Sequence, residues 1–486
     1  MSDLPPLTSL LPPDDRRLQY CYLGRRIFSP GVPFEPLWMR DSERSRPMLV
    51  LGSTGYGKSE FLISLAYGDA CKGRPVIFLD GKCDRTTRDR LYYYCHRKAG
   101  RPFYCLLPFQ HGDRDSHSWN PLLSATLPVS TIGECLFNAY FDPGGPHKGG
   151  GEVFYYDLQR DIFFHLLRAL HSCGFAFNTR DVKYLLERDE LLQELSRVLR
   201  PSGMLAYGDL MRTKSELGSR CRDVLLRFLA YLDWFEHWSL NSYNPSIQFD
   251  RLIPAGAVIY IGLPLGSEPQ RMAAIGNIVL NQLKALSAQV QNQTETSRRR
   301  TVSCILDDGA SFIDTGLAEW ICKVRSSGFL LTLGIQTIAS LEGRRPGFGD
   351  EIRSNAPNVF MYNPKDDKTA KWFSALARSE PHKVFTASVK ESEEGGSGTV
   401  RTAERPRIHP DAVLALPPGQ CYFSPPVLID RPPLLATPYL CPPSNHPEAV
   451  YVRPCQPGSQ DFRGLNLSVK MEDFSRTLGA AASSRK

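Results

Sequence analysis

Residues 52–59 read Gly-Ser-Thr-Gly-Tyr-Gly-Lys-Ser, which fits the phosphate-binding pattern G-x-x-x-x-G-K-[ST]. The glycines allow a tightly curled loop whose backbone N–H groups point inward at phosphate oxygens. In this pattern the lysine reaches the β- and γ-phosphates and the last hydroxyl ligates Mg²⁺. An apolar stretch, Met48–Leu51, precedes the loop and a helical pattern follows it. We therefore expect ATP to bind at Gly52, Ser53, Thr54, Gly55, Tyr56, Gly57, Lys58 and Ser59 rather than a Gly-rich turn without a ligand.

Apolar strand signals recur along the chain with helical patterns between them. They lie at Val76–Leu79, Phe103–Leu107, Val258–Ile261, Val302–Leu306 and Phe329–Ile335. Because strands that alternate with helices form parallel β/α units, we expect an α/β fold in which helices flank the sheet.

Between the strand signals at Phe103–Leu107 and Val258–Ile261 the sequence is largely helical, which indicates an all-α insertion. Beyond about residue 390 it becomes rich in Glu, Gly and Ser and then in Pro, which favours an extended arm. The expected organisation is an irregular segment 1–16, a nucleotide-binding domain in two parts, 17–145 and 249–390, the insertion 146–248, and the Pro-rich C-terminal arm 391–486.

The composition suits a soluble protein and gives weak hints about partners. The chain has 486 residues and a formal net charge of +7, which is compatible with nucleic acid or an anionic membrane surface but does not require either. Arg298–Arg300 can touch nucleic acid or form a solvated turn. We see no signal peptide, transmembrane stretch or C-x-x-C pair, and expect reduced thiols in a cytoplasmic protein.

Two acids end the strand Val302–Leu306, where a P-loop ATPase needs a carboxylate. Asp307 is the candidate that holds Mg²⁺ through water. Asp308 stands where many hydrolytic ATPases place a glutamate that polarises the attacking water. Since Asp is one methylene shorter, its carboxylate lies about 1 Å further back, and turnover is left open.

Gln336 and Arg325 are further candidates for the same site. Gln336 ends a buried strand and fits a γ-phosphate sensor, because ligands bind at the carboxyl edge of a parallel sheet; a structural cap is the alternative. Arg325 comes just past an amphipathic helix with Ile313 and Trp320 inward. It is either an arginine finger for a neighbouring subunit or a solvated helix-end charge.

Several motifs in order resemble the type IV coupling proteins of conjugation and type IV secretion, the TraD/TraG-like ATPases. The family's strand-Asp-x-Lys appears at Leu79–Lys82 and its Asn-Pro-Leu turn at Asn120–Leu122. After the strand with Asp307 come Val324–Gly328, Gly334–Thr337, Glu351–Asn355 and Asp367–Ala370, which are similar to the family's later signatures. The resemblance covers residues from about 20 to 425.

The resemblance implies a RecA-like P-loop sheet and an ATPase that recruits and translocates conjugative DNA or protein substrates to a type IV secretion channel. It implies catalytic roles for Lys58, Asp307, Asp308, Arg325 and Gln336, with ATP and Mg²⁺ as cofactors. It also implies a homo-oligomer, a hexameric ring, that handles relaxase-bound single-stranded DNA and meets inner-membrane components of the secretion system.

The chain departs from the family pattern in two respects. Asp308 replaces the usual Glu, and no N-terminal transmembrane anchor is visible, so we expect a separate anchor subunit at the cytoplasmic face of the inner membrane, or work from the cytosol. Two other functions stay open: a DNA-translocating ring ATPase of the FtsK/HerA type, and a nucleotide-binding recruitment platform with little turnover.

Overall fold

The computed structural model describes residues 20–27, 35–109, 115–140, 150–293, 295, 299–310, 317–342, 347–387, 398–425, 433–440 and 451. The chain divides into two compact units, and each is described by itself. Unit 1 consists of Met1–Gly68 and Leu331–Cys441, and unit 2 of Asp69–Leu330 and Pro442–Lys486. The irregular segment expected at 1–16, Arg298, Ile313 and the arm beyond 451 lie outside the described residues.

Unit 1 contains strands in the order β2-β1-β13-β12-β9-β3-β8. β3 runs parallel to β8 and β9, whereas the pairs from β9 outward to β2 are antiparallel. All residues of β3 and β9 are buried, as expected for strands covered on both faces. The strands are β1 (Tyr20–Ile27), β2 (Glu35–Arg40), β3 (Met48–Leu51), β8 (Phe329–Ile335, from Leu331 in this unit), β9 (Asn358–Met361), β12 (Gln420–Ser424) and β13 (Leu434–Ala436).

The helices of unit 1 connect these strands and pack against them. Phe61 in the long helix α2 lies 4.6 Å from Phe360 in β9, measured between ring centroids. The helices are α1 (Asp41–Arg44), α2 (Lys58–Cys71, which continues into unit 2), α13 (Ala339–Glu342), α14 (Phe348–Asn355), α15 (Asp367–Leu376) and α16 (Pro410–Leu414).

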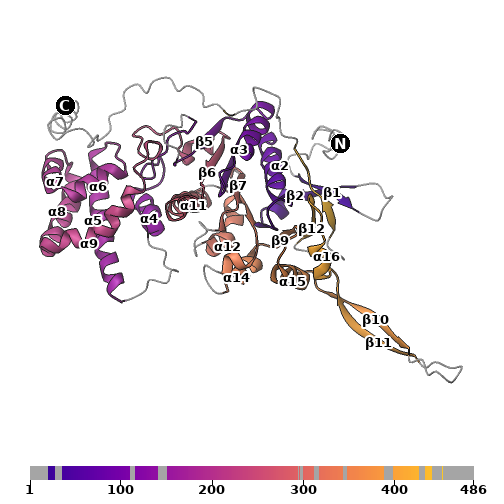
Figure 1. The fold of residues 1–486 in the computed structure, drawn as a ribbon. Coiled ribbons are helices and arrows are strands. Elements are labelled where there is room, and N and C mark those ends of the chain that lie inside the picture. Colours follow the sequence, from indigo (N-terminus) through magenta and orange to yellow (C-terminus); the bar gives the residue numbers. More distant parts are fainter. Residues whose placement is uncertain are drawn as a thin grey trace. The chain divides into compact units, whose positions relative to one another are not determined.

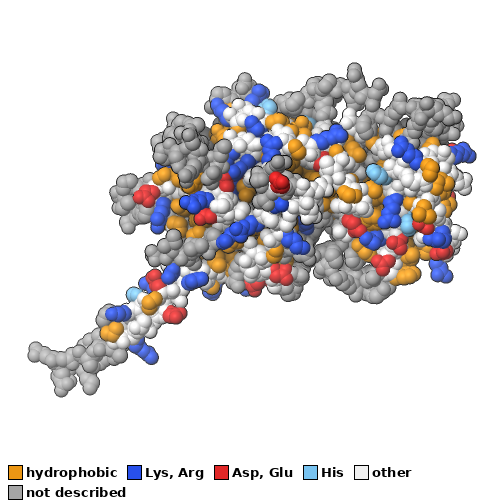
Figure 2. Space-filling view, turned by 180° about the vertical axis from the view of Figure 1, so that it is seen from behind, with side chains coloured by type: hydrophobic (Ala, Val, Ile, Leu, Met, Phe, Trp, Pro, Cys, Tyr) orange, Lys and Arg blue, Asp and Glu red, His pale blue; other side chains and the backbone are white. Residues whose placement is uncertain are grey.

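A two-stranded ribbon of β10 (Ser379–Ala387) and β11 (Gly398–Pro406) follows α15. It extends away from α15 and α16 in Figure 1, and charged and hydrophobic side chains alternate along it in Figure 2. Residues 398–440 fall in the segment for which we expected an extended arm, yet they hold β11, α16, β12 and β13. The strands β12 and β13 are short and lie between prolines, so they have too few alternating positions to be predicted from periodicity.

Unit 2 contains a parallel sheet in the order β7-β4-β6-β5, which confirms the expected α/β arrangement (Figure 1). Its strands are β4 (Val76–Asp80), β5 (Phe103–Leu106), β6 (Val258–Gly262) and β7 (Val302–Asp307), each close to its predicted position. The connecting helices are α3 (Arg85–Leu91), the π-helix η3 (Tyr92–Lys98), α11 (Pro269–Gln293) and α12 (Leu317–Ser327).

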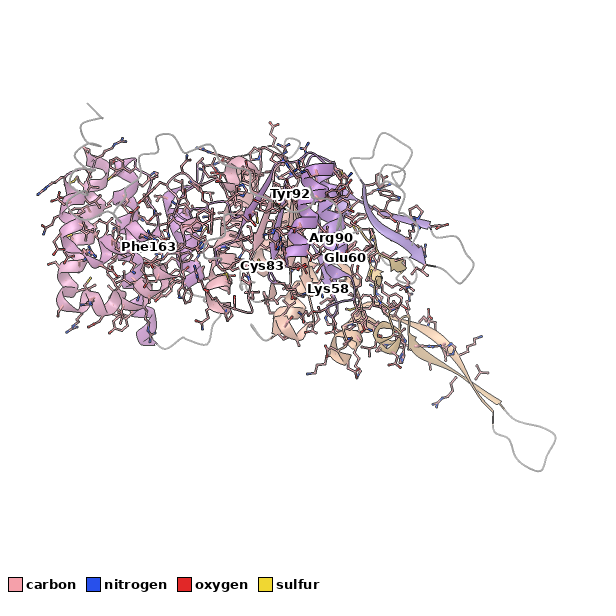
Figure 3. All side chains as sticks on the ribbon, turned by 45° about the horizontal axis from the view of Figure 1, so that its top comes forward. Lys58, Glu60, Cys83, Arg90, Tyr92 and Phe163 are labelled. Atoms are coloured by element: carbon pink, nitrogen blue, oxygen red, sulfur yellow. The ribbon has the colours of Figure 1, made fainter. Side chains whose placement is uncertain are left out.

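Most described residues between β5 and β6 lie in helices, as the sequence indicates, and the non-helical segments 115–128 and 241–248 meet in an isolated parallel bridge between Trp119 and Ile247. Its core is aromatic: Phe163 lies 5.8 Å from Phe137 and 5.1 Å from Phe228, between ring centroids (Phe163 is labelled in Figure 3). The elements are α4 (Val129–Tyr140), α5 (Gly150–Cys173), α6 (Thr179–Glu187), α7 (Asp189–Ser196), α8 (Pro201–Leu217), η4 (Gly218–Arg220), α9 (Cys221–Asp233), η5 (Trp238–Leu240) and α10 (Phe249–Leu252). The exact domain boundaries stay predictions.

Candidate nucleotide-binding site

The phosphate-binding pattern forms a loop between β3 and α2, in unit 1. Gly52, Gly55 and Gly57 have φ angles of +146°, +85° and +105°, which residues with a side chain rarely adopt. A Cβ on Gly52 would lie 2.5 Å from the Cβ of Tyr362, so no side chain fits there. The curled loop therefore depends on these glycines, and its shape fits a phosphate.

Hydrogen bonds from other segments of unit 1 hold the outer side of this loop. Ser53 donates its N–H to the Asn363 carbonyl (2.8 Å) and its hydroxyl to the Pro364 carbonyl (2.6 Å). Gly419 donates its N–H to the Tyr56 carbonyl (2.9 Å). The loop is thus fixed in one conformation by the segments that follow β9 and precede β12, which is the preorganisation that a binding loop needs.

Lys58 is the first residue of α2 and is 3% exposed. Its Nζ donates to the Gly52 carbonyl (2.5 Å) and to the Ser53 carbonyl (3.3 Å), so the ammonium group lies folded over its own loop. Ser59 and Glu60 follow in the first turn of α2, and Lys58 and Glu60 are labelled at this turn in Figure 3. A helix N-terminus with a lysine above a glycine loop is suited to an anionic ligand.

Gln336 lies at the same strand end as the loop. It directly follows β8, whose Ile335 is in register with Leu51, the residue before Gly52. The Gln336 side chain is exposed. Unit 1 therefore brings Gln336 and the beginning of the loop together at the carboxyl ends of two adjacent parallel strands, as predicted.

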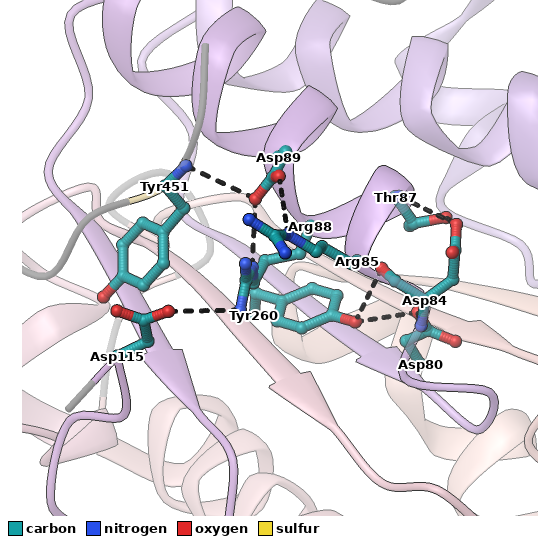
Figure 4. Close-up of polar contacts among 9 residues, drawn as sticks. All are labelled: Asp80, Asp84, Arg85, Thr87, Arg88, Asp89, Asp115, Tyr260 and Tyr451. Carbon is teal, nitrogen blue, oxygen red and sulfur yellow. Dashed lines mark hydrogen bonds and ion pairs between the residues drawn. The ribbon is translucent and has the colours of Figure 1, made fainter. Parts of the chain in front are cut away.

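In unit 2, Asp307 ends β7 beside Asp80, which ends β4, and the two are in register. Asp307 is 2% and Asp80 1% exposed. Tyr260 donates its hydroxyl to Asp80 Oδ2 (2.8 Å), as Figure 4 shows, and the N–H groups of Lys82 and Asp84 also donate to Asp80 (2.9 Å each). Burial, together with the nearby Asp307 charge, raises the pKa of Asp80 to about 6.

Asp308 has a φ of 53° and forms an ion pair with Lys82, with 3.1 Å between Nζ and Oδ2. A Cβ on Gly81 would lie 2.5 Å from the Asp308 carbonyl oxygen, so only glycine lets the two segments approach this closely. Burial lowers the pKa of Lys82, but the carboxylates of Asp308, Asp307 and Asp80 outweigh it and the pKa is raised. Lys82 therefore carries a positive charge beside both predicted acids.

Arg325 lies in the last turn of α12 and its side chain is exposed. The expectation that it follows the helix is wrong, because α12 continues to Ser327. Within unit 2 the structure groups Asp307 and Asp308 with residues of β4 and the loop after it. An exposed position at a helix end is compatible with both roles that the sequence left open for Arg325.

Three residues of this acidic group received no role from the sequence: Asp80, Lys82 and Tyr260. Asp80 ends a buried apolar strand, the same signal that identified Asp307. Lys82 belongs to the strand-Asp-x-Lys motif, but its role became apparent only through its contact with Asp308. The role of Tyr260 became apparent only through its contact with Asp80, because both contacts join segments that are far apart in the sequence.

No helix among the described residues is long and apolar enough to span a membrane. In the same residues no cluster of three His, Cys, Asp or Glu side chains is arranged to hold a metal ion.

Comparisons with known proteins support the family suggested by the motifs. A family model described as the TraM recognition site of TraD and TraG matches residues 301–418. The type 4 coupling protein DotL of Legionella pneumophila is 21% identical over 392 residues, which are 70% of this chain and 49% of DotL. The chain thus spans about half the length of this relative.

The fold is that of a known coupling protein. The unbound structure of the bacterial conjugative coupling protein TrwBΔN70 is similar with a TM-score of 0.55 and 16% identity, over 89% of this chain and 97% of that one. TrwB in complex with ADP and Mg²⁺ matches with a TM-score of 0.54 and 17% identity, over 88% and 97%. The predicted fold class, a P-loop sheet flanked by helices, is confirmed by these similarities. The resemblance to the type IV coupling proteins that the motifs indicate is supported by the family-model match over residues 301–418 and by the similarity to DotL.

Proposed function

We propose that this protein is an ATP-dependent coupling protein that recruits and translocates relaxase-bound DNA or protein substrates to a type IV secretion channel. The observation that carries the proposal is the glycine loop between β3 and α2, with Lys58 folded over it and Gln336 at the adjacent strand end. The similarity to DotL and TrwB, and the bound ADP and Mg²⁺ named for TrwB, support the same function.

In this proposal the loop from Gly52 to Ser59 binds the ATP phosphates through its backbone N–H groups. Lys58 leaves the carbonyls of Gly52 and Ser53 and pairs with the β- and γ-phosphates. Gln336 contacts the γ-phosphate, which separates the ATP-bound from the ADP-bound state.

The acidic residues of unit 2 serve hydrolysis in the proposal. The Ser59 hydroxyl and, through water, Asp307 would hold Mg²⁺, which would supply positive charge to offset that of the phosphates. Asp308 orients the attacking water, and Lys82 holds the Asp308 carboxylate in position. Arg325, exposed on α12, acts on the site of a neighbouring subunit, where its fork offsets charge on the transferring phosphoryl group.

We further propose a homo-oligomeric ring, a hexamer, at the cytoplasmic face of the inner membrane, which meets inner-membrane components of the secretion system. The family-model match over 301–418 supports recruitment of a substrate-bound partner by that part of the chain. DNA contacts in such a motor track the backbone and depend strongly on salt.

The proposal is tested by DNA-stimulated ATP hydrolysis measured beside the oligomeric state, in the wild type and in Arg325→Ala. An arginine finger predicts that the variant loses hydrolysis while its oligomer persists. Two results together would contradict the proposed motor. The wild type would hydrolyse no ATP with single- or double-stranded DNA, and Lys58→Ala would still transfer substrate.

The Lys82–Asp308 ion pair favours one second candidate, a recruitment platform that binds ATP and turns it over slowly. A short acid whose charge is already paired is a weak base for water activation. This function predicts that Asp308→Glu raises ATP hydrolysis markedly and that Lys58→Ala abolishes substrate docking. An unchanged rate in Asp308→Glu counts against the platform.

A further inference from the structure

The four parallel strands of unit 2 begin at an edge that carries several arginines. Val76, Val258, Phe103 and Ser303 are in register, which aligns the residues just before them. Arg74 precedes β4, Arg101 precedes β5, and Arg299 and Arg300 precede β7, whereas Gly256 precedes β6. This amino edge is opposite to the strand ends that carry Asp80 and Asp307.

Two of these arginines, Arg74 and Arg299, form ion pairs or hydrogen bonds with other residues of the chain. Arg74 pairs with Asp69, with 3.1 Å between Nη1 and Oδ1. Arg299 donates to the carbonyls of Gln291 (2.9 Å) and Ser326 and thereby ties α11 to the end of α12. Both therefore have structural roles.

The other two arginines, Arg101 and Arg300, converge on one point. A Cβ placed on Gly256 would lie 3.2 Å from the Gly73 carbonyl oxygen, 3.3 Å from Arg101 Nη1 and 3.5 Å from Arg300 Nη2. The two nitrogens therefore lie within about 7 Å of each other, the sum of the last two distances, where like charges repel. Gly256 has a φ of +71° and is buried, so the point of convergence is a rigid turn without a side chain.

Arg101 is also incompletely satisfied. Its Nε is buried and has no hydrogen-bond partner within the described part of the chain. Among those same residues neither Arg101 nor Arg300 has a carboxylate partner, and Arg300 bonds only to the carbonyl of Pro254. Arg101 is half-buried and Arg300 is exposed, so an anion from solvent can reach the pair and offset the repulsion between the two charges.

We propose that Arg101 and Arg300 form a phosphate-binding site over Gly256, and that its ligand is the phosphodiester backbone of a single-stranded nucleic acid. Two guanidinium forks can each donate two hydrogen bonds to one phosphate group. Neighbouring strands are about 4.8 Å apart, so the edge from β7 to β5 spans about 14 Å, enough for several phosphates of one strand.

A membrane surface offers phosphates too, but this edge lacks the apolar anchors of a membrane-binding face. The large hydrophobic side chains exposed in the described residues lie elsewhere: Phe154, Tyr155, Met204, Leu205, Leu226, Trp238, Val400 and Tyr439. The inference rests on the proposed function only for the choice of nucleic acid; the site itself follows from the arginine geometry.

The test is the binding of a fluorescent single-stranded oligonucleotide of about 20 nucleotides, at several salt concentrations, to the full chain and to Arg101→Gln/Arg300→Gln. We expect the double variant to bind at least about tenfold more weakly at low salt, with a salt slope smaller by about 0.7, because the contact with one phosphate is lost. Arg222→Gln, which removes an exposed arginine of α9, is the matched control and should bind as the wild type does.

Three further measurements keep the test decisive. Arg101→Lys/Arg300→Lys keeps the charge but loses the fork and should recover only part of the affinity. All variants should bind a fluorescent ATP analogue with the same affinity. If the double variant does not fold, the single variant Arg300→Gln, at an exposed position, replaces it. If the wild type does not bind the ATP analogue, the proposed function is contradicted, but the phosphate-binding site of Arg101 and Arg300 is not.

The inference is overturned if the double variant binds the oligonucleotide as tightly as Arg222→Gln does. It is also overturned if the oligonucleotide affinity is unchanged and the variant instead loses binding to vesicles that contain phosphatidylserine.

Discussion

Lys82 Nζ lies 3.1 Å from Asp308 Oδ2, and this ion pair joins the loop after β4 to the end of β7. The lysine side chain is 36% and the aspartate side chain 16% exposed, so water partly screens the pair. Its structural consequence is orientation: Asp308 follows a buried strand in a left-handed conformation, and Lys82 fixes the direction of its carboxylate.

The first prediction concerns this orientation. Lys82→Met should lower kcat for ATP about tenfold and leave KM nearly unchanged, because the lysine acts through Asp308 and not on the phosphates. Lys82→Arg should recover part of the rate. A double-mutant cycle with Asp308→Asn should give a coupling free energy of about 0.5–1 kcal/mol in unfolding experiments. A rise in KM with an unchanged kcat would show that Lys82 binds the nucleotide instead.

The second prediction uses the close approach at Gly81. Gly81→Ala should destabilise the protein by about 2 kcal/mol or more and lower ATP turnover, because the new methyl group meets the Asp308 carbonyl at 2.5 Å. Gly266→Ala, in the loop after β6, is the control, since a Cβ there has no atom within 4 Å. The melting temperature and the rate of ATP hydrolysis of the two variants test this prediction. Equal changes in Gly81→Ala and Gly266→Ala would contradict it.

The third prediction concerns pH. The folded protein binds the Asp80 proton more tightly than the unfolded chain, in which the Asp pKa is about 3.9. The contribution of Asp80 to the free energy of unfolding should therefore fall by about 3 kcal/mol between pH of about 4 and about 6, and stay level above that.

This contribution is measured as the difference in the free energy of unfolding by urea between the wild type and Asp80→Asn across that pH range. Titration of groups that do not interact with Asp80 cancels in this difference. A difference that does not change with pH would mean that Asp80 is ionised throughout.

The fourth prediction concerns Tyr451, which is 1% exposed in unit 2. Its N–H donates to Asp89, as Figure 4 shows. Its hydroxyl lies 3.0 Å from His117 Nδ1, and the Arg88 guanidinium lies over its ring. Tyr451→Phe keeps the ring and should lose about 1 kcal/mol of stability. Tyr451→Ala also loses the packing against Tyr92 and should lose about 3–5 kcal/mol. Equal melting temperatures for the two variants would contradict a packing role.

The nucleotide loop and the buried parallel strands could be predicted from the sequence because their signals are local. Gly52, Lys58 and Asp307 each stand at a fixed offset from an apolar strand, and the structure has the strands where expected. Asn363 and Gly419, which hold the loop from outside, could not be found, because their bonds to Ser53 and Tyr56 close over hundreds of residues.

The partners of the charged side chains could not be predicted from the sequence either. Arg299 and Arg300 are neighbours of the same type, yet Arg299 bonds to backbone carbonyls while Arg300 reaches toward Gly256. Only the fold of unit 2 distinguishes them, because the partners come from α11, α12 and the turn before β6. The sequence likewise gave Lys82 no role, although it lies beside Asp308.

The most direct test of the central claim is the rate of ATP hydrolysis in the presence of single-stranded DNA, compared between the wild type and Lys58→Ala. If the loop binds and activates ATP, the variant should lose at least about a hundredfold in rate, since a charge-stabilising group is removed from the phosphates. Its melting temperature without nucleotide should stay close to that of the wild type. Hydrolysis by Lys58→Ala at the wild-type rate would contradict the account.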